Sequence, residues 1–197
     1  MNRERAWETV VEHVEDVGLR RHMLAVEAAV KSYAAKLGGD PEVWGLAGLL
    51  HDYDWEIHPT LEGHPAEGIH LLRERGFSAP VLQAILAHNT AGTGVERSEP
   101  LDFALLACDE ITGLIIAATL VRPHKDIRSI KVKSIKRNWK DRLFTAAVSR
   151  EEVSEAVEDF SRVCFDGKLQ LWEHVAHVLE AMQGVAAELD LDGRLAS

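Results

Sequence analysis

Apolar residues recur at helical spacing along most of this chain, and no stretch keeps the strict alternation that is typical of a strand. Gly38-Gly39 ends one apolar stripe. Asp40 and Pro41 follow, and these residue types are common at the N-cap and in the first turn of a helix. The pattern predicts an all-α protein of about nine helices. In the first two thirds of the chain, helices are expected over residues 22–37, 41–50, 64–76, 81–88 and 103–118.

The last third of the chain shows the pattern of two further amphipathic helices. Ser149 followed by Glu152 fits a capping box, and an apolar stripe follows from Val153 to Cys164. A last helix is predicted over Leu169 to Leu189. These helices are expected to complete the core, or to form the face of a homodimer. Because nothing in the sequence marks a linker, residues 1–197 are predicted to form one compact domain.

The helix expected over residues 103–118 is apolar on nearly every face, which is typical of a central helix. Asp109 and Glu110 lie in its middle, so at least one of these acids is expected to face the interior. Two acids in a membrane span would each cost about 2.5–3.5 kcal/mol, which argues against a membrane segment. A buried carboxylate is stabilised by a divalent cation, by backbone amides or by an arginine. Asp109 alone does not decide among these.

A second buried polar feature is the pair His51-Asp52, which ends the apolar run from Val43 to Leu50. Burying ionisable groups costs several kcal/mol unless they are paired or bind a metal. Other histidines and Asp109 accompany the pair in the order His, His-Asp, His, His, Asp. This constellation favours a metal site, and its members are His22, His51, Asp52, His64, His88 and Asp109.

The pattern resembles the HD superfamily of all-helical, metal-dependent phosphohydrolases. The resemblance covers roughly residues 20–120, which leaves 121–197 as a C-terminal helical extension. It implies that His22, His51, Asp52 and Asp109 bind a primary metal and that His51 and Asp52 form the catalytic centre. In members with two metals, two further histidines bind the second ion, and His64 and His88 match them, with Asp52 as the bridge. Tyr53-Asp54 departs from the Ile-Gly that often follows in the cyclic-dinucleotide branch.

The donor set restricts the metal to one or two divalent ions. Imidazole suits iron, zinc, manganese and nickel, whereas carboxylate suits harder ions. Iron or manganese is therefore favoured, and magnesium, zinc, nickel or cobalt is compatible. If only the four primary ligands bind a metal, His64 and His88 contact the substrate instead.

The resemblance implies hydrolysis of a phosphoester or phosphoanhydride bond, in a nucleotide or another small phosphorylated metabolite, by a metal-activated water. Asp54, Glu56 and Glu67 are candidates for the acid that protonates the leaving group, because they lie close to the ligands in sequence. Two alternatives remain open. The same ligand set serves di-iron oxygenases of this fold, and a domain of this fold can bind a nucleotide without turnover.

Charge is distributed unevenly along the chain. The formal net charge is −10, which disfavours binding to duplex nucleic acid. Residues 122–142 nevertheless hold nine basic residues and only Asp126 and Asp141 as acids. Lys131 and Lys133 are the candidate contacts to a substrate phosphate. The alternative is a solvated helix face, because the apolar residues Ile127, Ile130, Ile135, Trp139 and Leu143 recur at near-helical spacing.

Two further histidines could form another metal site, and the cysteines indicate the cellular compartment of the protein. His174 and His177 lie three residues apart but lack a third ligand, so they are interpreted as polar residues of a surface helix. Cys108 and Cys164 are predicted to be reduced thiols, and the first residues form no apolar run. A cytoplasmic protein is therefore expected.

Overall fold

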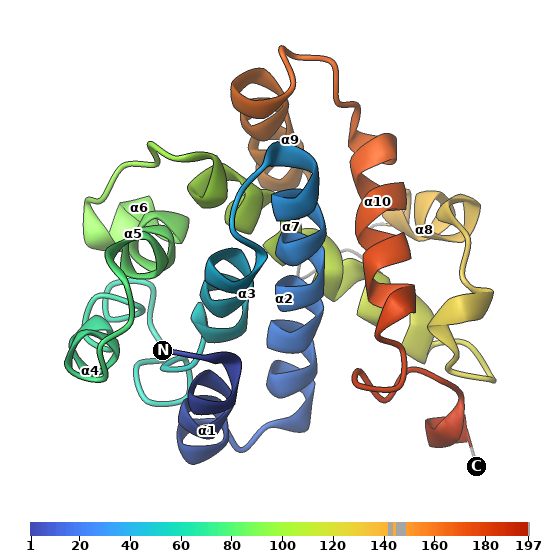
Figure 1. Ribbon diagram of the computed structural model, residues 1–197. Helices are drawn as coiled ribbons and strands as arrows, with labels where there is room; N and C mark the ends of the chain where they lie inside the picture. Colours follow the sequence, from blue (N-terminus) through green and yellow to red (C-terminus); the bar gives the residue numbers. More distant parts are fainter. Residues whose placement is uncertain (142–143, 145–148, 197) are drawn as a thin grey trace. The chain divides into compact units, whose positions relative to one another are not determined.

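The computed structural model describes residues 1–141, 144 and 149–196 (Figure 1). Within this part of the chain the regular structure is helical, apart from an isolated antiparallel bridge between Asp126 and Asp192. The all-α prediction is confirmed. The helices are α1 (Arg3–His13), α2 (Val17–Leu37), α3 (Pro41–Leu50), α4 (Ile69–Glu74), α5 (Ala79–His88), α6 (Thr90–Thr93), α7 (Pro100–Leu120), η1 (Ile127–Ser129), α8 (Val132–Trp139), α9 (Arg150–Cys164), α10 (Leu171–Gly184) and η2 (Arg194–Ala196).

The chain divides into two compact units, residues 1–105 and 106–197, and each is described by itself. The first holds α1 to α6 and the start of α7. The second holds the rest of α7 and the helices that follow. The expectation of a single domain over 1–197 stays a prediction.

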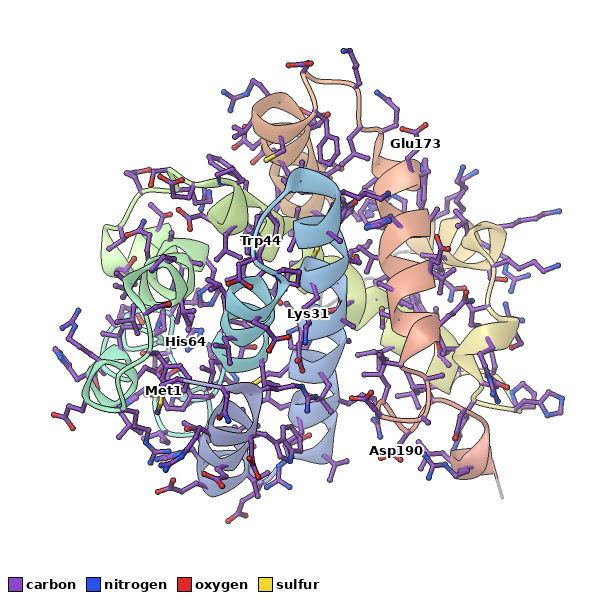
Figure 2. The ribbon with its side chains drawn as sticks, in the orientation of Figure 1. Met1, Lys31, Trp44, His64, Glu173 and Asp190 are labelled. Atoms are coloured by element: carbon purple, nitrogen blue, oxygen red, sulfur yellow. The ribbon has the colours of Figure 1, made fainter. Side chains whose placement is uncertain are left out.

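Helix α3 is the centre of the first unit. It packs against α1, α2 and α5, and every residue from Trp44 to Leu50 is buried. Its glycines allow a close approach to α2. A Cβ added at Gly48 would lie 2.9 Å from the Glu27 backbone nitrogen, and one at Gly45 would lie 2.7 Å from Cδ of Lys31. Figure 2 labels Lys31 on α2 and Trp44 on α3. This tight packing fixes the end of α3, where His51 follows.

The connection between α3 and α4 differs from the sequence prediction. A helix was expected to begin at His64-Pro65, but residues 51–68 form successive turns and α4 begins only at Ile69. Several hydrogen bonds here span three residues rather than the four of an α-helix: the carbonyls of Leu50, Asp52 and Thr60 accept from the amides of Tyr53, Trp55 and Gly63. The connection therefore holds His64 in a turn.

Helix α2 also begins earlier than the pattern predicts. The Asp16 side chain accepts from the Leu19 amide as an N-cap, so α2 starts at Val17, and His22 lies inside it rather than at its start.

In the second unit, α10 packs against α8, α9 and η1. The two predicted amphipathic helices of the last third of the chain are present as α9 and α10, and the Ser149 side chain accepts from the Glu152 amide at the start of α9. Helix α10 is shorter than expected, because it ends at Gly184 and turns follow it.

Helix α7 is long and apolar enough to cross a membrane by length and composition alone. A mostly buried core helix meets the same criteria, and 61% of the apolar stretch of α7 is buried. The helix therefore has the properties expected of the central helix that the sequence indicates.

Candidate metal centre

Five of the six predicted ligands come from the first unit, and the structure brings them together. Helix α2 carries His22, the end of α3 places His51 and Asp52, and α5 ends on His88. His64 comes from the turns between α3 and α4. Side chains from three helices and one connection therefore form the cluster.

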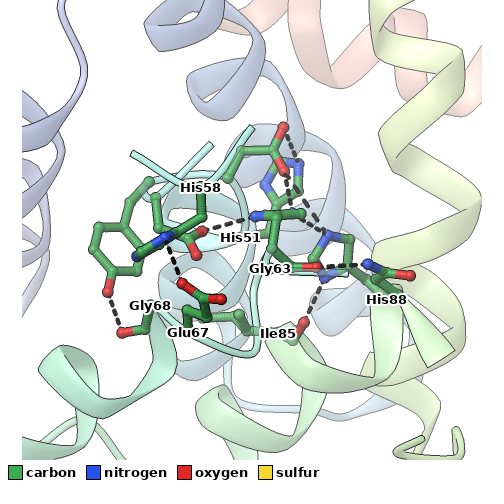
Figure 3. Close-up of polar contacts among 12 residues, drawn as sticks. His51, His58, Gly63, Glu67, Gly68, Ile85 and His88 are labelled. Atoms are coloured by element: carbon green, nitrogen blue, oxygen red, sulfur yellow. Dashed lines mark hydrogen bonds and ion pairs between the residues drawn. The ribbon is translucent and has the colours of Figure 1, made fainter. Parts of the chain in front are cut away.

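The cluster consists of two histidine pairs that share one carboxylate, and Figure 3 labels one member of each pair, His51 and His88. The Nε2 atoms of His22 and His51 lie 3.2 Å apart, and those of His64 and His88 lie 3.0 Å apart. We call these groups, each with Asp52, the His22–His51 half-site and the His64–His88 half-site.

Asp52 contributes one oxygen to each half-site. Its Oδ2 lies 3.3 Å from His51 Nε2 and 3.7 Å from His22 Nε2. Its Oδ1 lies 3.2 Å from His64 Nε2 and 3.8 Å from His88 Nε2. This is the arrangement that a carboxylate bridging two cations requires.

The Nδ1 atoms of three histidines have acceptors that point Nε2 toward the centre. His51 donates from Nδ1 to the Gly48 carbonyl over 2.9 Å, and His88 donates to the Ile85 carbonyl. His64 donates from Nδ1 to Oδ1 of Asp54 over 2.8 Å. A hydrogen bond at one ring nitrogen fixes the tautomer, so the Nε2 lone pairs remain available to a metal.

Further bonds hold the connection that carries His64. The Asn89 side-chain amide, directly after α5, donates to the carbonyls of Leu61 and His64 over 2.7 and 2.6 Å. The Tyr53 hydroxyl donates to the Gly68 carbonyl. These contacts tie the turns to α5 and keep His64 opposite His88.

The electrostatics of the cluster favour positive charge at its centre. Burial opposes ionisation of Asp52, but the charge and hydrogen bond of His51 and the bond from His64 outweigh it and hold the Asp52 pKa well below its usual range. Burial likewise opposes charging of His64, but its bonds to Asp52 and Asp54 raise its pKa to about 9. A divalent cation would supply the same positive charge.

The donor chemistry fits a divalent metal. Imidazole nitrogen and carboxylate oxygen are the ligands of iron, manganese and zinc sites. His51 is fully buried, whereas the side chains of His22 and Asp52 each keep 18% of their surface exposed. The centre is therefore removed from solvent at His51 and in contact with solvent at His22 and Asp52.

The sixth predicted ligand, Asp109, lies half-buried on α7 in the second unit. The two metal-binding groups found among the described residues do not include it. Its role stays a prediction, as does that of Lys131 and Lys133, which are exposed at the start of α8. Of the basic and apolar residues predicted nearby, Arg142 and Leu143 lie outside the described residues.

The three candidates for the leaving-group acid have other contacts. Asp54 is fully buried and bonded to His64, so it does not face a substrate. The Glu56 carboxylate accepts from the backbone amides of Glu15 and Asp16 at the start of α2. Glu67 is exposed and lies 3.0 Å from His58. The burial of Asp54 contradicts that role for it, whereas the roles of Glu56 and Glu67 stay predictions.

The interpretation of His174 as a surface residue is wrong. His174 is fully buried on α10, and its Nε2 donates to the Ala107 carbonyl over 2.7 Å. His177 is half-buried, and the metal-binding groups among the described residues include neither histidine. That the pair does not bind a metal stays a prediction.

The sequence profile of the HD domain family matches residues 19–164, which contain both half-sites and Asp109. This chain belongs to the HD domain family. HD domain proteins are generally metal-dependent hydrolases and bind divalent metals. The histidine and aspartate cluster of the first unit is compatible with that chemistry.

Part of this HD domain protein is similar in sequence to several ribonucleases Y. Ribonuclease Y of Cutibacterium acnes is 32% identical over 94 residues, which cover 47% of this chain and 17% of that protein. Ribonuclease Y 1 of Pediococcus pentosaceus is 33% identical over 93 residues, with the same coverage of 47% and 17%. Ribonuclease Y of Desulforudis audaxviator is 34% identical over 95 residues, with 47% and 18% covered. The match thus spans less than a fifth of these relatives. No solved structure matched the chain.

Proposed function

We propose that this HD domain protein hydrolyses a phosphoester or phosphoanhydride bond of a nucleotide or another small phosphorylated metabolite. The observation that carries the proposal is the convergence of four histidine Nε2 atoms on the two oxygens of Asp52. Such a donor set would hold one or two divalent cations, and a pair of cations would supply the chemistry of two-metal phosphoryl transfer.

In this proposal His22, His51 and Asp52 hold one ion, with Asp109 as a further ligand, and Asp52, His64 and His88 hold the other. Iron or manganese is the first choice for this mixed imidazole and carboxylate set. When bound, the ions supply a nucleophilic water at neutral pH and positive charge against the phosphate oxygens. Asp52 would offer one oxygen to each ion, and the Nδ1 bonds of His51, His64 and His88 hold the rings in place.

The substrate class rests on charge and on the relatives. Lys131 and Lys133 are exposed cations in a chain of net charge −10, and we propose that they bind a substrate phosphate. The net charge supports a small substrate rather than duplex nucleic acid. The names of the relatives add short RNA to the compounds to be tested. Cys108 and Cys164 are free, which supports a reducing, cytoplasmic setting.

The first test is elemental analysis of the purified protein together with a phosphate-release screen. The screen uses nucleotides, sugar phosphates and a short RNA with added Mn²⁺ or Fe²⁺. Two metal equivalents with hydrolysis support the proposal. Two irons with oxygen consumption and no hydrolysis would replace it by the oxygenase alternative, and a metal-free protein that binds nucleotide without turnover would replace it by the binding domain.

Variants test the ligand assignment separately. Asp52→Ala is expected to lose both metals, because its two oxygens serve both half-sites. Asp109→Ala is expected to lower the metal content of the His22–His51 half-site. His70→Ala is the matched control, because His70 is exposed on α4. Normal metal loading of Asp109→Ala would remove Asp109 from the ligand set.

A further inference from the structure

The Asp54 carboxylate is buried behind His64, at the ring edge opposite to the Nε2 atom that faces Asp52. Its side chain is fully buried, and its Oδ1 accepts the Nδ1 hydrogen of His64 over 2.8 Å. Its Oδ2 is buried and has no hydrogen-bond partner within the described residues. Gly68 lies directly against this carboxylate, and a Cβ at that position would collide with it. The absence of a side chain at Gly68 therefore leaves room for the Asp54 carboxylate behind His64.

The acceptors behind the ligand histidines differ between the two half-sites. His51 in one half-site and His88 in the other donate from Nδ1 to backbone carbonyls, those of Gly48 and Ile85. A carbonyl is a neutral acceptor, whereas the carboxylate behind His64 is an anionic one. Among these three rings, only His64 has a charged side chain behind it.

A carboxylate behind a ligating histidine has known physical effects. It fixes the tautomer and the orientation of the ring and raises the basicity of the nitrogen that faces the metal. Burying a carboxylate with one oxygen unpaired is unfavourable unless positive charge lies nearby. The His64–His88 half-site is where a cation would provide that charge, with His64 between the cation and Asp54.

We propose that Asp54 is a positioning residue that controls metal occupancy of the His64–His88 half-site and leaves the His22–His51 half-site unaffected. The inference rests on the metal centre of the proposed function. It assigns to Asp54 a role that requires no contact with substrate. Because the loss of such a partner typically weakens metal binding 10- to 100-fold, the effect is large enough to measure at one site of two.

The experiment is a titration of the metal-depleted full chain with Mn²⁺. Calorimetry and electron paramagnetic resonance monitor the binding. The wild-type protein is expected to bind two ions per chain. In Asp54→Asn, one site is expected to keep its affinity and the other to weaken about 10- to 100-fold. Asparagine keeps an oxygen that can accept from His64, so this change removes the charge with little change in shape.

Asp102→Asn is the matched control. Asp102 is also a buried aspartate of the first unit, its Oδ2 accepts from the amides of Ser98 and Glu99, and its Oδ1 has no partner in the described part of the chain. This variant is expected to bind both ions with wild-type affinity. Unchanged binding by folded Asp54→Asn, or an equal loss at both sites, would overturn the proposal.

A second measurement applies if Asp54→Asn does not fold. Imidazole nitrogen spectra of the wild-type protein are expected to show His64 protonated at Nδ1 before and after Mg²⁺ or Zn²⁺ is added. A metal-loaded protein with His64 protonated at Nε2 would refute the role of Asp54. These readouts do not involve hydrolysis, so a protein that binds two ions but hydrolyses nothing would contradict the proposed function alone. A protein that binds no ion would contradict both proposals.

Discussion

The buried His174 makes the stability of this protein depend on pH. Its side chain has no exposed surface, its Nε2 donates to the Ala107 carbonyl over 2.7 Å, and the Phe160 ring packs edge-on against it. Burial lowers the pKa of His174 to about 4, although the bond to Ala107 opposes the shift, and nearby His177 adds to it. The imidazole is therefore neutral in the folded protein at neutral pH.

The sign and size of the effect follow from this pKa. In the unfolded chain His174 takes up a proton near its usual pKa of 6.5, whereas the folded protein excludes the proton until about pH 4. The unfolded state thus binds more protons between these values, and stability rises with pH across that window. The contribution is complete above the unfolded pKa and is lost as pH falls. From about pH 7.5 to about pH 5 the loss is about 2 kcal/mol, and the full shift corresponds to about 3 kcal/mol.

Urea unfolding of the wild-type protein and of His174→Gln at these two pH values measures the effect. Glutamine keeps an N–H donor for the Ala107 carbonyl but does not titrate. The free energy of unfolding of the wild type is expected to fall by about 2 kcal/mol more than that of the variant. His70→Gln removes an exposed histidine and is expected to show the wild-type pH dependence.

The same pH dependence in wild type and His174→Gln would refute this reasoning. If the variant does not fold, an NMR titration of His174 in the wild-type protein replaces the comparison of urea unfolding. A His174 that is already protonated at about pH 5 in the folded protein would contradict the lowered pKa.

Two further predictions concern the packing of α3 and the basic residues of α8. Gly48→Ala is expected to lower the free energy of unfolding by about 1–3 kcal/mol, because the new Cβ would lie 2.8 Å from Val30 Cγ2 and 2.9 Å from the Glu27 backbone nitrogen. In urea unfolding, Gly113→Ala is the control without a steric cost, since no atom lies within 4 Å of its added Cβ, and equal stability of both variants would contradict the packing argument. The double variant Lys131→Gln/Lys133→Gln is expected to raise KM for a phosphorylated substrate about tenfold with unchanged metal content, because both lysines are exposed and exposed ion pairs contribute up to about 1 kcal/mol each, whereas a tenfold change corresponds to about 1.4 kcal/mol. Lys168→Gln serves as its control, and an unchanged KM in the double variant would exclude these lysines from phosphate binding.

The sequence predicts the centre of the first unit better than its connections. The apolar run that ends at His51 identifies α3 because a buried helix needs apolar residues on every face. The position of His64 in a turn was missed, because turn hydrogen bonds within residues 51–68 leave no periodic signal. Asp54 was misread as an acid for the leaving group, because its partner is set by how that connection folds back.

The error at His174 could have been avoided from spacing alone. His174 lies three residues after Leu171 and four before Val178, which puts it on the apolar stripe that α10 buries. A polar residue on that stripe must find a partner inside the protein, and the Ala107 carbonyl is that partner. The identity of the acceptor depends on tertiary packing within the second unit, which no local pattern encodes.

The end of α3 explains why two aspartates that are so close in sequence have separable roles. Asp52 and Asp54 contact opposite nitrogens of one ring: Asp52 lies 3.2 Å from His64 Nε2, and Asp54 lies 2.8 Å from His64 Nδ1. Residues two positions apart point in nearly opposite directions in a helix, and the turns after Leu50 let both carboxylates reach His64 from its two edges. Loss of Asp52 therefore removes an oxygen from both half-sites, whereas loss of Asp54 acts on one. A metal count of zero for Asp52→Ala and of one for Asp54→Asn at limiting Mn²⁺ would distinguish the bridge from its support.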